Sequence, residues 1–187
     1  MARVIILGAG RPHRGSEPSA LIRTDIGKRV LDRVIDAFKS SGISKFFFVG
    51  GYKIEEIINL YPNIHFSINE SWQATGSLDS LLNAPLDPRQ TSFVCYSDIV
   101  FTPETIAELA RVEGDVVIVA DRAWRDRYSS RTAEDFAKAE KVRIRDGKVW
   151  EIGPQVAVES ADAEYIGVMK LSPAAVKRIL QLKRDAR

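Results

Sequence analysis

A short glycine-containing segment has the residue types that bind phosphate. Gly8-Ala9-Gly10-Arg11-Pro12-His13-Arg14 follows directly on the apolar run Val4–Leu7. Small residues at such a turn let backbone N–H groups approach a phosphate, and Arg11 and Arg14 can neutralise its charge. A plain tight turn that carries surface arginines is the alternative interpretation. We predict that this loop holds the phosphates of a nucleotide.

The same loop begins like a dinucleotide-binding fingerprint, which requires three glycines. His13 stands where the third glycine would be. The second predicted strand ends in Gly50-Gly51, where an acid would be needed for a ribose hydroxyl. An NAD-dependent oxidoreductase is therefore not favoured.

A carboxylate follows another predicted strand, Ser92–Tyr96. Asp98 lies at the carboxyl end of that strand, and ligands of open α/β sheets bind at this edge. A carboxylate in this place can hold Mg²⁺, which bridges phosphate oxygens in phosphoryl transfer. The alternative is that Asp98 caps the turn that follows it.

Two further polar segments lie at predicted strand ends or helix starts. Thr75-Gly76-Ser77 precedes a helix, where Ser77 is interpreted as an N-cap or, alternatively, as facing a ligand. A run that follows the fifth predicted strand is either an anion site or a solvated loop; it contains Asp121, Arg122, Trp124, Arg125 and Arg131. His13 and His65 have no partners at metal-ligand spacing, so neither is a zinc candidate. Asp79 and Asp87 are interpreted as ordinary surface acids.

Strands and helices alternate in the first half of the chain, which predicts right-handed crossovers and a largely parallel, doubly wound α/β sheet. Apolar positions from about Gly27 to Ser41 share one helical face, and Gly42 suits the helix end. In the second half, alternating residues around Asp146-Gly147 predict a late β-hairpin over 142–152. The other predicted elements are strands at Lys45–Val49, Ile64–Ile68, Val116–Ala120 and Tyr165–Leu171, and helices at Ile54–Leu60, Ser77–Ala84, from Thr102-Pro103 and from Ser172-Pro173.

Composition narrows the class of protein. A length of 187 residues suits one domain, and 45% hydrophobic with 28% charged residues is ordinary for a globular protein. Cys95 is the only cysteine, which excludes disulfides and a cysteine-rich zinc site. The net charge is +2 with basic residues scattered among acids, so a nucleic acid is not an expected partner. No apolar run approaches the ~18 residues that span a membrane, so a membrane is not expected either. We expect a cytoplasmic protein.

Taken together, several segments resemble one family, the MobA-like and sugar-phosphate nucleotidyltransferases. The likeness is strongest to the branch that activates phosphocholine or phosphonates with CTP. The opening Ile6-Leu7-Gly8-Ala9-Gly10-Arg11-x-x-Arg14 is similar to the glycine-rich opening of this family. The other matching segments are Pro18–Leu21, Gly27–Leu31, Thr75–Leu81, Tyr96–Ile99, Asp121–Arg131, Ala139–Val142 and Tyr165–Val168.

The resemblance implies a fold, a reaction and site residues. The fold would be a three-layer, Rossmann-like α/β/α nucleotide-diphospho-sugar transferase fold. Leu7, Gly8, Ala9, Gly10, Arg11 and Arg14 would bind the triphosphate, and Thr75, Gly76 and Ser77 the base. Arg11, Arg14 and Asp98 would serve catalysis, with Asp98 as the Mg²⁺ ligand. Asp121, Arg131 and Lys141 would bind a small phosphate, phosphonate or sugar-phosphate acceptor, whose oxygen attacks the α-phosphorus of the nucleoside triphosphate, with CTP favoured, as pyrophosphate leaves.

Three departures from the family pattern keep a second hypothesis open. Ser19 occupies the place of the loop lysine, and Pro12 replaces the second loop glycine. The chain stops at Arg187, before a later strand where relatives place a second metal-binding carboxylate, so truncation at the C-terminus is one interpretation. The alternative function is a catalytically degenerate domain that senses nucleotide or mediates assembly.

Overall fold

The computed structural model describes residues 2–13, 15–127 and 131–185. Contacts between residues divide the chain into two compact units. The first unit comprises residues 1–117 and 169–187, and the second comprises 118–168. The expectation of a single domain over 1–187 stays a prediction.

Four parallel strands form the sheet of the first unit, in the order β3-β2-β1-β4. Within β1, Val4, Ile5 and Ile6 are completely buried, as expected of a strand covered on both faces. Leu7 pairs with Val49 on one side and with Tyr96 on the other, so the three strands end at one edge. The bounds are β1 (Ala2–Gly8), β2 (Phe46–Gly50), β3 (His65–Ile68) and β4 (Thr91–Tyr96).

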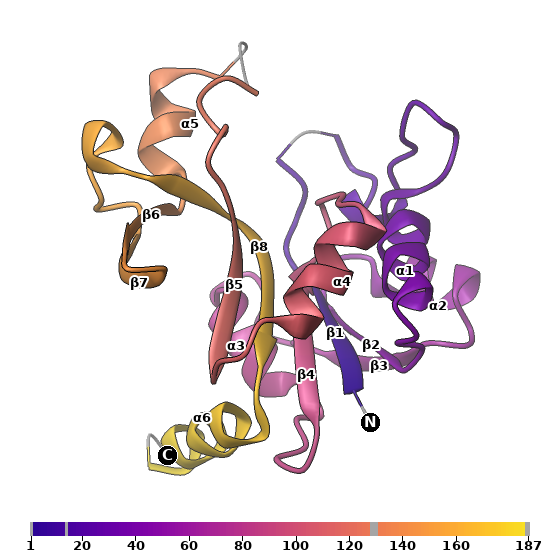
Figure 1. The fold of residues 1–187 in the computed structure, drawn as a ribbon. Coiled ribbons are helices and arrows are strands. Elements are labelled where there is room, and N and C mark those ends of the chain that lie inside the picture. Colours follow the sequence, from indigo (N-terminus) through magenta and orange to yellow (C-terminus); the bar gives the residue numbers. More distant parts are fainter. Residues whose placement is uncertain (1, 14, 128–130, 186–187) are drawn as a thin grey trace. The chain divides into compact units, whose positions relative to one another are not determined.

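Helices cover both faces of this sheet (Figure 1). On one face, α1 packs against α4, and Phe38 meets the rings of Phe46, Phe93 and Phe101 edge to face. On the other face, α3 and α6 contribute Leu81 and Val176 to an apolar core. The predicted three-layer α/β fold with a mostly parallel sheet is confirmed. The helices are α1 (Val30–Ser40), α2 (Ile54–Leu60), α3 (Ser77–Asn83), α4 (Pro103–Arg111) and α6 (Pro173–Asp185).

Local sequence signals explain most helix ends. Helix α1 starts later than expected, because the carboxylate of Asp32 accepts the Arg29 N–H and fixes Arg29 as the N-cap. Gly42 adopts a φ of 75°, the left-handed conformation predicted for it. Helix α4 begins at Pro103 after Thr102, as predicted. Short 3-10 turns lie at Ser19–Leu21 (η1) and Val158–Ser160 (η2).

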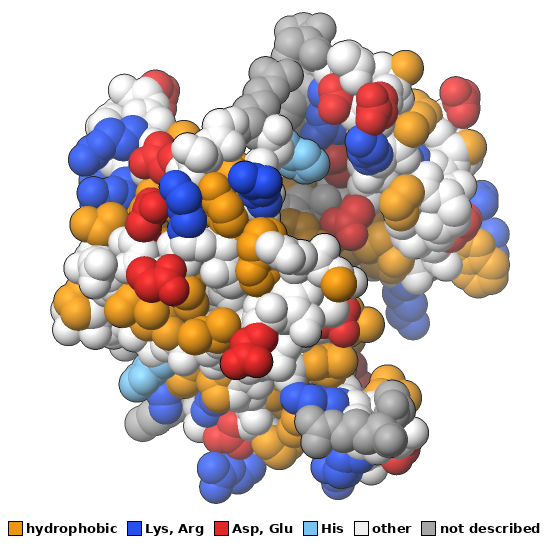
Figure 2. Space-filling view, turned by 180° about the vertical axis from the view of Figure 1, so that it is seen from behind, with side chains coloured by type: hydrophobic (Ala, Val, Ile, Leu, Met, Phe, Trp, Pro, Cys, Tyr) orange, Lys and Arg blue, Asp and Glu red, His pale blue; other side chains and the backbone are white. Residues whose placement is uncertain are grey.

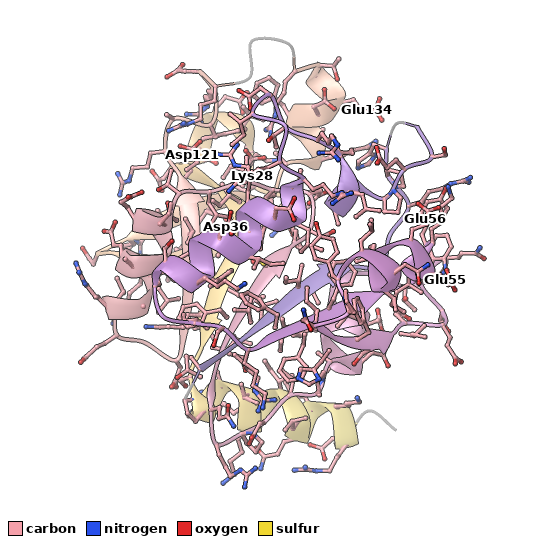
Figure 3. All side chains as sticks on the ribbon, turned by 90° about the vertical axis from the view of Figure 1, so that its right-hand side faces the viewer. Lys28, Asp36, Glu55, Glu56, Asp121 and Glu134 are labelled. Atoms are coloured by element: carbon pink, nitrogen blue, oxygen red, sulfur yellow. The ribbon has the colours of Figure 1, made fainter. Side chains whose placement is uncertain are left out.

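Charged side chains at helix surfaces form local ion pairs. Lys28, which precedes α1, donates to Asp36 within the helix at 2.7 Å, and both residues are exposed (Figure 3). Glu55 and Glu56 lie in the first turn of α2, where their negative charge suits the N-terminal end of the helix dipole (Figure 3). On the face seen in Figure 2, basic and acidic side chains are interspersed among the coloured residues.

The interpretation of Asp87 as an ordinary surface acid is wrong. The guanidinium of Arg3, itself only 5% exposed, donates to Asp87 Oδ2 at 3.1 Å and to the Pro85 carbonyl. Arg89 and Gln90 donate to the same carboxylate. Hydrogen bonds from the Arg89 side chain, followed by its backbone N–H, lower the pKa of Asp87 to about 2.

The second unit contains the antiparallel part of the structure. The β6–β7 hairpin turns at Asp146 and Gly147, whose φ values of 51° and 72° fit the predicted Asp-Gly turn. Strands β5 and β6 both pair with β8. Trp124 is fully buried in a small core with Ala139, Val156 and Ala161. The elements are β5 (Val116–Asp121), α5 (Ala133–Lys138), β6 (Lys141–Arg145), β7 (Lys148–Gly153) and β8 (Ala163–Leu171); β5 begins and β8 ends in the first unit.

In the described part of the chain, every helix is too short or too polar to cross a membrane.

Candidate nucleotide site

A cavity of about 240 Å³ lies at the carboxyl edge of the first unit's sheet. One wall is the loop after β1, and the other is the end of β4. The parallel register places Leu7 beside Tyr96, so residues some ninety positions apart in sequence meet here. The lining residues are Leu7, Gly8, Gly10, Arg11, Pro12, His13, Pro18, Ser19, Ala20, Tyr96, Ser97 and Asp98.

The two predicted parts of the site, the loop after β1 and the carboxylate of Asp98, therefore line the same cavity. Arg11 and Asp98 are both exposed and both line the cavity. Arg14, the second predicted loop arginine, lies outside the described residues. Backbone N–H groups, a guanidinium and a carboxylate around one cavity can hold an anion and a cation together.

The two loop glycines have different surroundings. A Cβ on Gly8 would lie 2.3 Å from the ring of Phe48 and 2.6 Å from Ser97 Oγ, so only glycine fits. At Gly10, which is exposed, a Cβ would meet no described atom within 4 Å. Gly8 is thus required by the fold, whereas the absence of a side chain at Gly10 leaves the backbone open to a ligand.

Asp98 is a single carboxylate, and a metal would need further ligands. Among the described residues no group of three or more His, Cys, Asp or Glu could hold an ion. Mg²⁺ commonly keeps several waters and is bound through one or two carboxylates together with substrate phosphates. Asp98 at the cavity wall fits that kind of shared site. Behind it, burial raises the pKa of the Cys95 thiol, and the charge of Asp98 adds to the effect, so Cys95 stays a neutral core residue.

The predicted base-binding turn lies at a different cavity of the same unit. Thr75 lines a space of about 330 Å³ with Asn69 and Asp79, whereas Gly76 and Ser77 line neither of these two cavities. The interpretation of Ser77 as the N-cap is wrong: Gly76 is the N-cap of α3, and its N–H donates to the carboxylate of Asp79. Glycine can take this place because a side chain from the next turn satisfies its N–H.

The three predicted acceptor residues lie in the second unit, each with partners there. Asp121, labelled in Figure 3, pairs with Arg127 at 2.8 Å. Arg131 donates to Glu164 at 2.9 Å. The Lys141 ammonium is 1% exposed and donates to three carbonyls at the end of α5, those of Phe136, Ala137 and Ala139. Their role in acceptor binding stays a prediction.

Two cavity residues were not among the residues predicted to form the site. His13 lies within the predicted phosphate loop, in the place of a third glycine, and it lines the cavity beside Pro12. Ser19, the position of the family lysine, also faces the cavity. The signal that could have found them was their position in and just after the phosphate loop.

This arrangement, an α/β sheet with a glycine-containing loop opposite a strand-end carboxylate, is that of a nucleotidyltransferase fold. The MobA-like NTP transferase domain model matches residues 4–185, and the chain belongs to this family.

Characterised relatives and solved structures agree with this assignment. The chain is 28% identical over 183 residues to the CTP:phosphoglutamine cytidylyltransferase of Campylobacter jejuni, a match that covers 90% of this chain and 72% of the relative. The inositol-1-phosphate CTP transferase of T. maritima has the same fold, with a TM-score of 0.70 and 18% identity over 99% of this chain and 82% of that one. The CTP:phosphocholine cytidylyltransferase of Streptococcus pneumoniae gives a TM-score of 0.65 and 19% identity over 100% and 79% of the two chains.

Proposed function

We propose that the chain transfers a nucleoside monophosphate from a nucleoside triphosphate to a small phosphorylated acceptor and releases pyrophosphate. The observation that carries the proposal is the single cavity that Gly10, Arg11 and Asp98 share at the sheet edge.

The reaction requires positioning and charge neutralisation more than proton transfer. An anionic phosphate or phosphonate oxygen of the acceptor attacks the α-phosphorus, the bond between that phosphorus and the bridging oxygen breaks, and pyrophosphate leaves with the electron pair. The loop N–H groups and the Arg11 guanidinium would hold the triphosphate and take up charge that develops on it. A bound Mg²⁺, with Asp98 as its protein ligand, would supply Lewis-acid neutralisation of the phosphate oxygens.

The comparisons support CTP as the nucleotide. The C. jejuni, T. maritima and S. pneumoniae proteins are all named for CTP and a phosphorylated acceptor. For this chain we propose the same substrate class, a cytidine triphosphate with a small phosphate or phosphonate. Asp121, Arg131 and Lys141 are the proposed acceptor side.

A second candidate function rests on the loop itself. Ser19 faces the cavity without the positive charge of a lysine, and Pro12 cannot donate a backbone hydrogen bond. A domain with this loop could bind nucleotide for sensing or assembly without turnover.

Measuring pyrophosphate release distinguishes the nucleotidyltransferase from the domain that binds nucleotide without turnover. The protein would be incubated with Mg²⁺, each of the four nucleoside triphosphates, and phosphocholine, inositol phosphate, phosphoglutamine or an aminoalkylphosphonate. We expect release with CTP and at least one acceptor, and its loss in Asp98→Ala. Asp36→Asn, at an exposed carboxylate on α1, is the matched control and should retain full activity.

No release with any acceptor, together with a rise in melting temperature on adding CTP, would favour the sensing domain. No release and no stabilisation by any nucleotide would reject both nucleotide functions.

A further inference from the structure

Tyr52, which follows the end of β2, contacts the phosphate loop from outside the cavity. It is not among the residues that line the nucleotide cavity. Its backbone N–H donates to the Ala9 carbonyl at 2.9 Å, and its hydroxyl donates to the Ser16 carbonyl at 3.1 Å. One residue thus holds the loop near both of its ends.

The ring of Tyr52 also has two cations over it, Arg11 and Lys53, and the Lys53 ammonium lies 5.7 Å from the ring centroid. The Arg11 guanidinium carbon lies 5.4 Å from the ring centroid, within the range of a cation–π interaction. Arg11 is exposed, and a long exposed side chain loses rotamer freedom when it must hold an anion. A ring that restricts the guanidinium in advance lowers that entropic cost of binding.

The ring of Tyr52 is also in contact with Trp72. The two rings meet edge to face, with centroids 5.6 Å apart and an interplanar angle of 66°. Trp72 can lie this close because Gly51 has no side chain: a Cβ there would be 2.6 Å from Trp72 Cγ. Trp72 therefore restricts the position of the Tyr52 ring, and glycine at position 51 makes this contact possible.

Trp72 in turn belongs to the segment that leads into the Thr75 turn. Asn69, which is 2% exposed, anchors this segment: its backbone N–H donates to the Gly50 carbonyl at 2.8 Å and its side-chain amide donates to Thr75 Oγ1 at 2.9 Å. The Trp72 N–H donates to the Asn69 carbonyl at 3.2 Å, so the contacts are continuous from the Thr75 turn through Trp72 and Tyr52 to Arg11.

We propose that Tyr52 is a positioning residue that aims Arg11 at the triphosphate and couples the phosphate loop to the Thr75 turn. The inference rests on the proposed nucleotide function and adds the residue that determines how well the loop binds. Tyr52 does not line the cavity, so its effect on the nucleotide must pass through Arg11 and through the loop segments that it holds.

A double-mutant cycle with Tyr52→Leu and Arg11→Ala tests this, with Kd for CTP and the KM and kcat of pyrophosphate release as readouts. In the wild-type background we expect Tyr52→Leu to raise Kd and KM for CTP about tenfold, and Tyr52→Phe, which loses only the hydroxyl, about threefold. In the Arg11→Ala background, Tyr52→Leu should raise Kd only about threefold, because the contact with the guanidinium is already absent and only the hydroxyl bond to Ser16 is lost. A purely structural role would give the same fold-change in both backgrounds.

A matched control is available in the second unit, where Arg145 lies 4.5 Å above the Trp150 ring in the β6–β7 hairpin. Trp150→Leu removes the same kind of interaction and should leave Kd for CTP unchanged. If Tyr52→Leu does not fold, Trp72→Leu replaces it, because that variant removes the ring's support and leaves the loop hydrogen bonds; the same dependence on Arg11 is expected.

Two outcomes overturn the inference, and they differ. An active wild type in which the Tyr52 and Arg11 effects are additive, or in which Tyr52→Leu binds CTP normally, rejects the positioning role alone. A wild type that neither binds CTP nor releases pyrophosphate rejects the proposed function, and the positioning role with it.

Discussion

Gly8 and Ser97 join the two walls of the nucleotide cavity in direct contact. The Ser97 N–H donates to the Leu7 carbonyl at 3.0 Å, and a Cβ on Gly8 would lie 2.6 Å from Ser97 Oγ. Ser97 is 7% exposed and is followed by Asp98, the proposed metal ligand. The position of that carboxylate relative to the phosphate loop therefore depends on the missing side chain at Gly8.

Gly8→Ala should destabilise the protein and weaken nucleotide binding together. The added methyl must displace Phe48 or Ser97 in a packed region, and overpacking of this kind costs about 1–3 kcal/mol of unfolding free energy. Moving Ser97 also moves Asp98, so Kd for CTP should rise with Mg²⁺ present. Urea unfolding and calorimetric titration measure the two effects.

Gly10→Ala provides the comparison for stability, because a Cβ there meets no described atom within 4 Å. Its unfolding midpoint should match that of the wild type. Equal stability of the Gly8 and Gly10 variants would contradict the packing argument.

Ser19→Lys should increase activity. Ser19 lines the cavity, and a lysine there would add a cation where the family pattern places one. We expect kcat/KM for CTP to rise about tenfold, since a charge-assisted hydrogen bond to phosphate is stronger than a neutral one. Steady-state pyrophosphate release is the measurement.

Ser40→Lys adds the same charge at an exposed position near the end of α1 and should leave kcat/KM unchanged. An equal gain in both variants would show a general charge effect. No gain in Ser19→Lys would mean that the position does not reach the phosphates.

Much of the fold could be predicted because its signals are local. The buried run Val4–Leu7, the apolar face of α1 and the Asp146-Gly147 turn each lie within a few residues. Once the strands are parallel, Gly8 and Asp98 must come to one edge of the sheet, but the pairing of β1 with β4 that brings them to one cavity was not predicted. Helix α5 was missed because none of its six residues is buried, which leaves no apolar periodicity to detect.

Contacts between distant residues could not be predicted in the same way. Tyr52 reaches Ser16 across 36 positions, and Arg3 reaches Asp87 across 84. Nothing in the local sequence of Tyr52 distinguishes a surface tyrosine from one that holds a loop. Such pairs are set by the crossover geometry and side-chain packing.

The Asp87 carboxylate should make stability depend on pH in the acid range. Its pKa of about 2 in the folded protein lies below the ordinary value of 3.8, so the folded state binds fewer protons than the unfolded state there. The stabilisation is complete above the unfolded pKa and is lost as the pH falls toward 2. Asp87→Asn should lower the unfolding free energy at pH 7, with the difference from wild type shrinking between about pH 4 and pH 2.

The largest cause of the lowered Asp87 pKa is the side chain of Arg89. Removing that side chain therefore tests the cause of the shift. In Arg89→Met, NMR titration should show the pKa of Asp87 shifted upward while the Arg3 contact remains. An unchanged Asp87 pKa in that variant would assign the effect to other groups.

Lys141→Met should destabilise the second unit. Three carbonyls at the end of α5 accept from the buried ammonium, and methionine leaves them without it. Loss of hydrogen bonds to a buried charged group costs about 2 kcal/mol. Thermal unfolding should show the loss, whereas Lys138→Met, at an exposed lysine paired with Glu134, should change stability little.

The same variant also decides between the two roles of Lys141. If the ammonium mainly fixes the end of α5 to β6, Lys141→Met lowers the melting temperature, and a high concentration of acceptor does not restore kcat at a temperature where the variant is partly unfolded. If the ammonium binds the acceptor, the melting temperature is close to that of the wild type and the KM for the acceptor rises while the Kd for CTP is unchanged. The three hydrogen bonds of 3.0 to 3.2 Å and the 1% exposure are the grounds for the first result, whereas the proposed acceptor role of Lys141 requires the second.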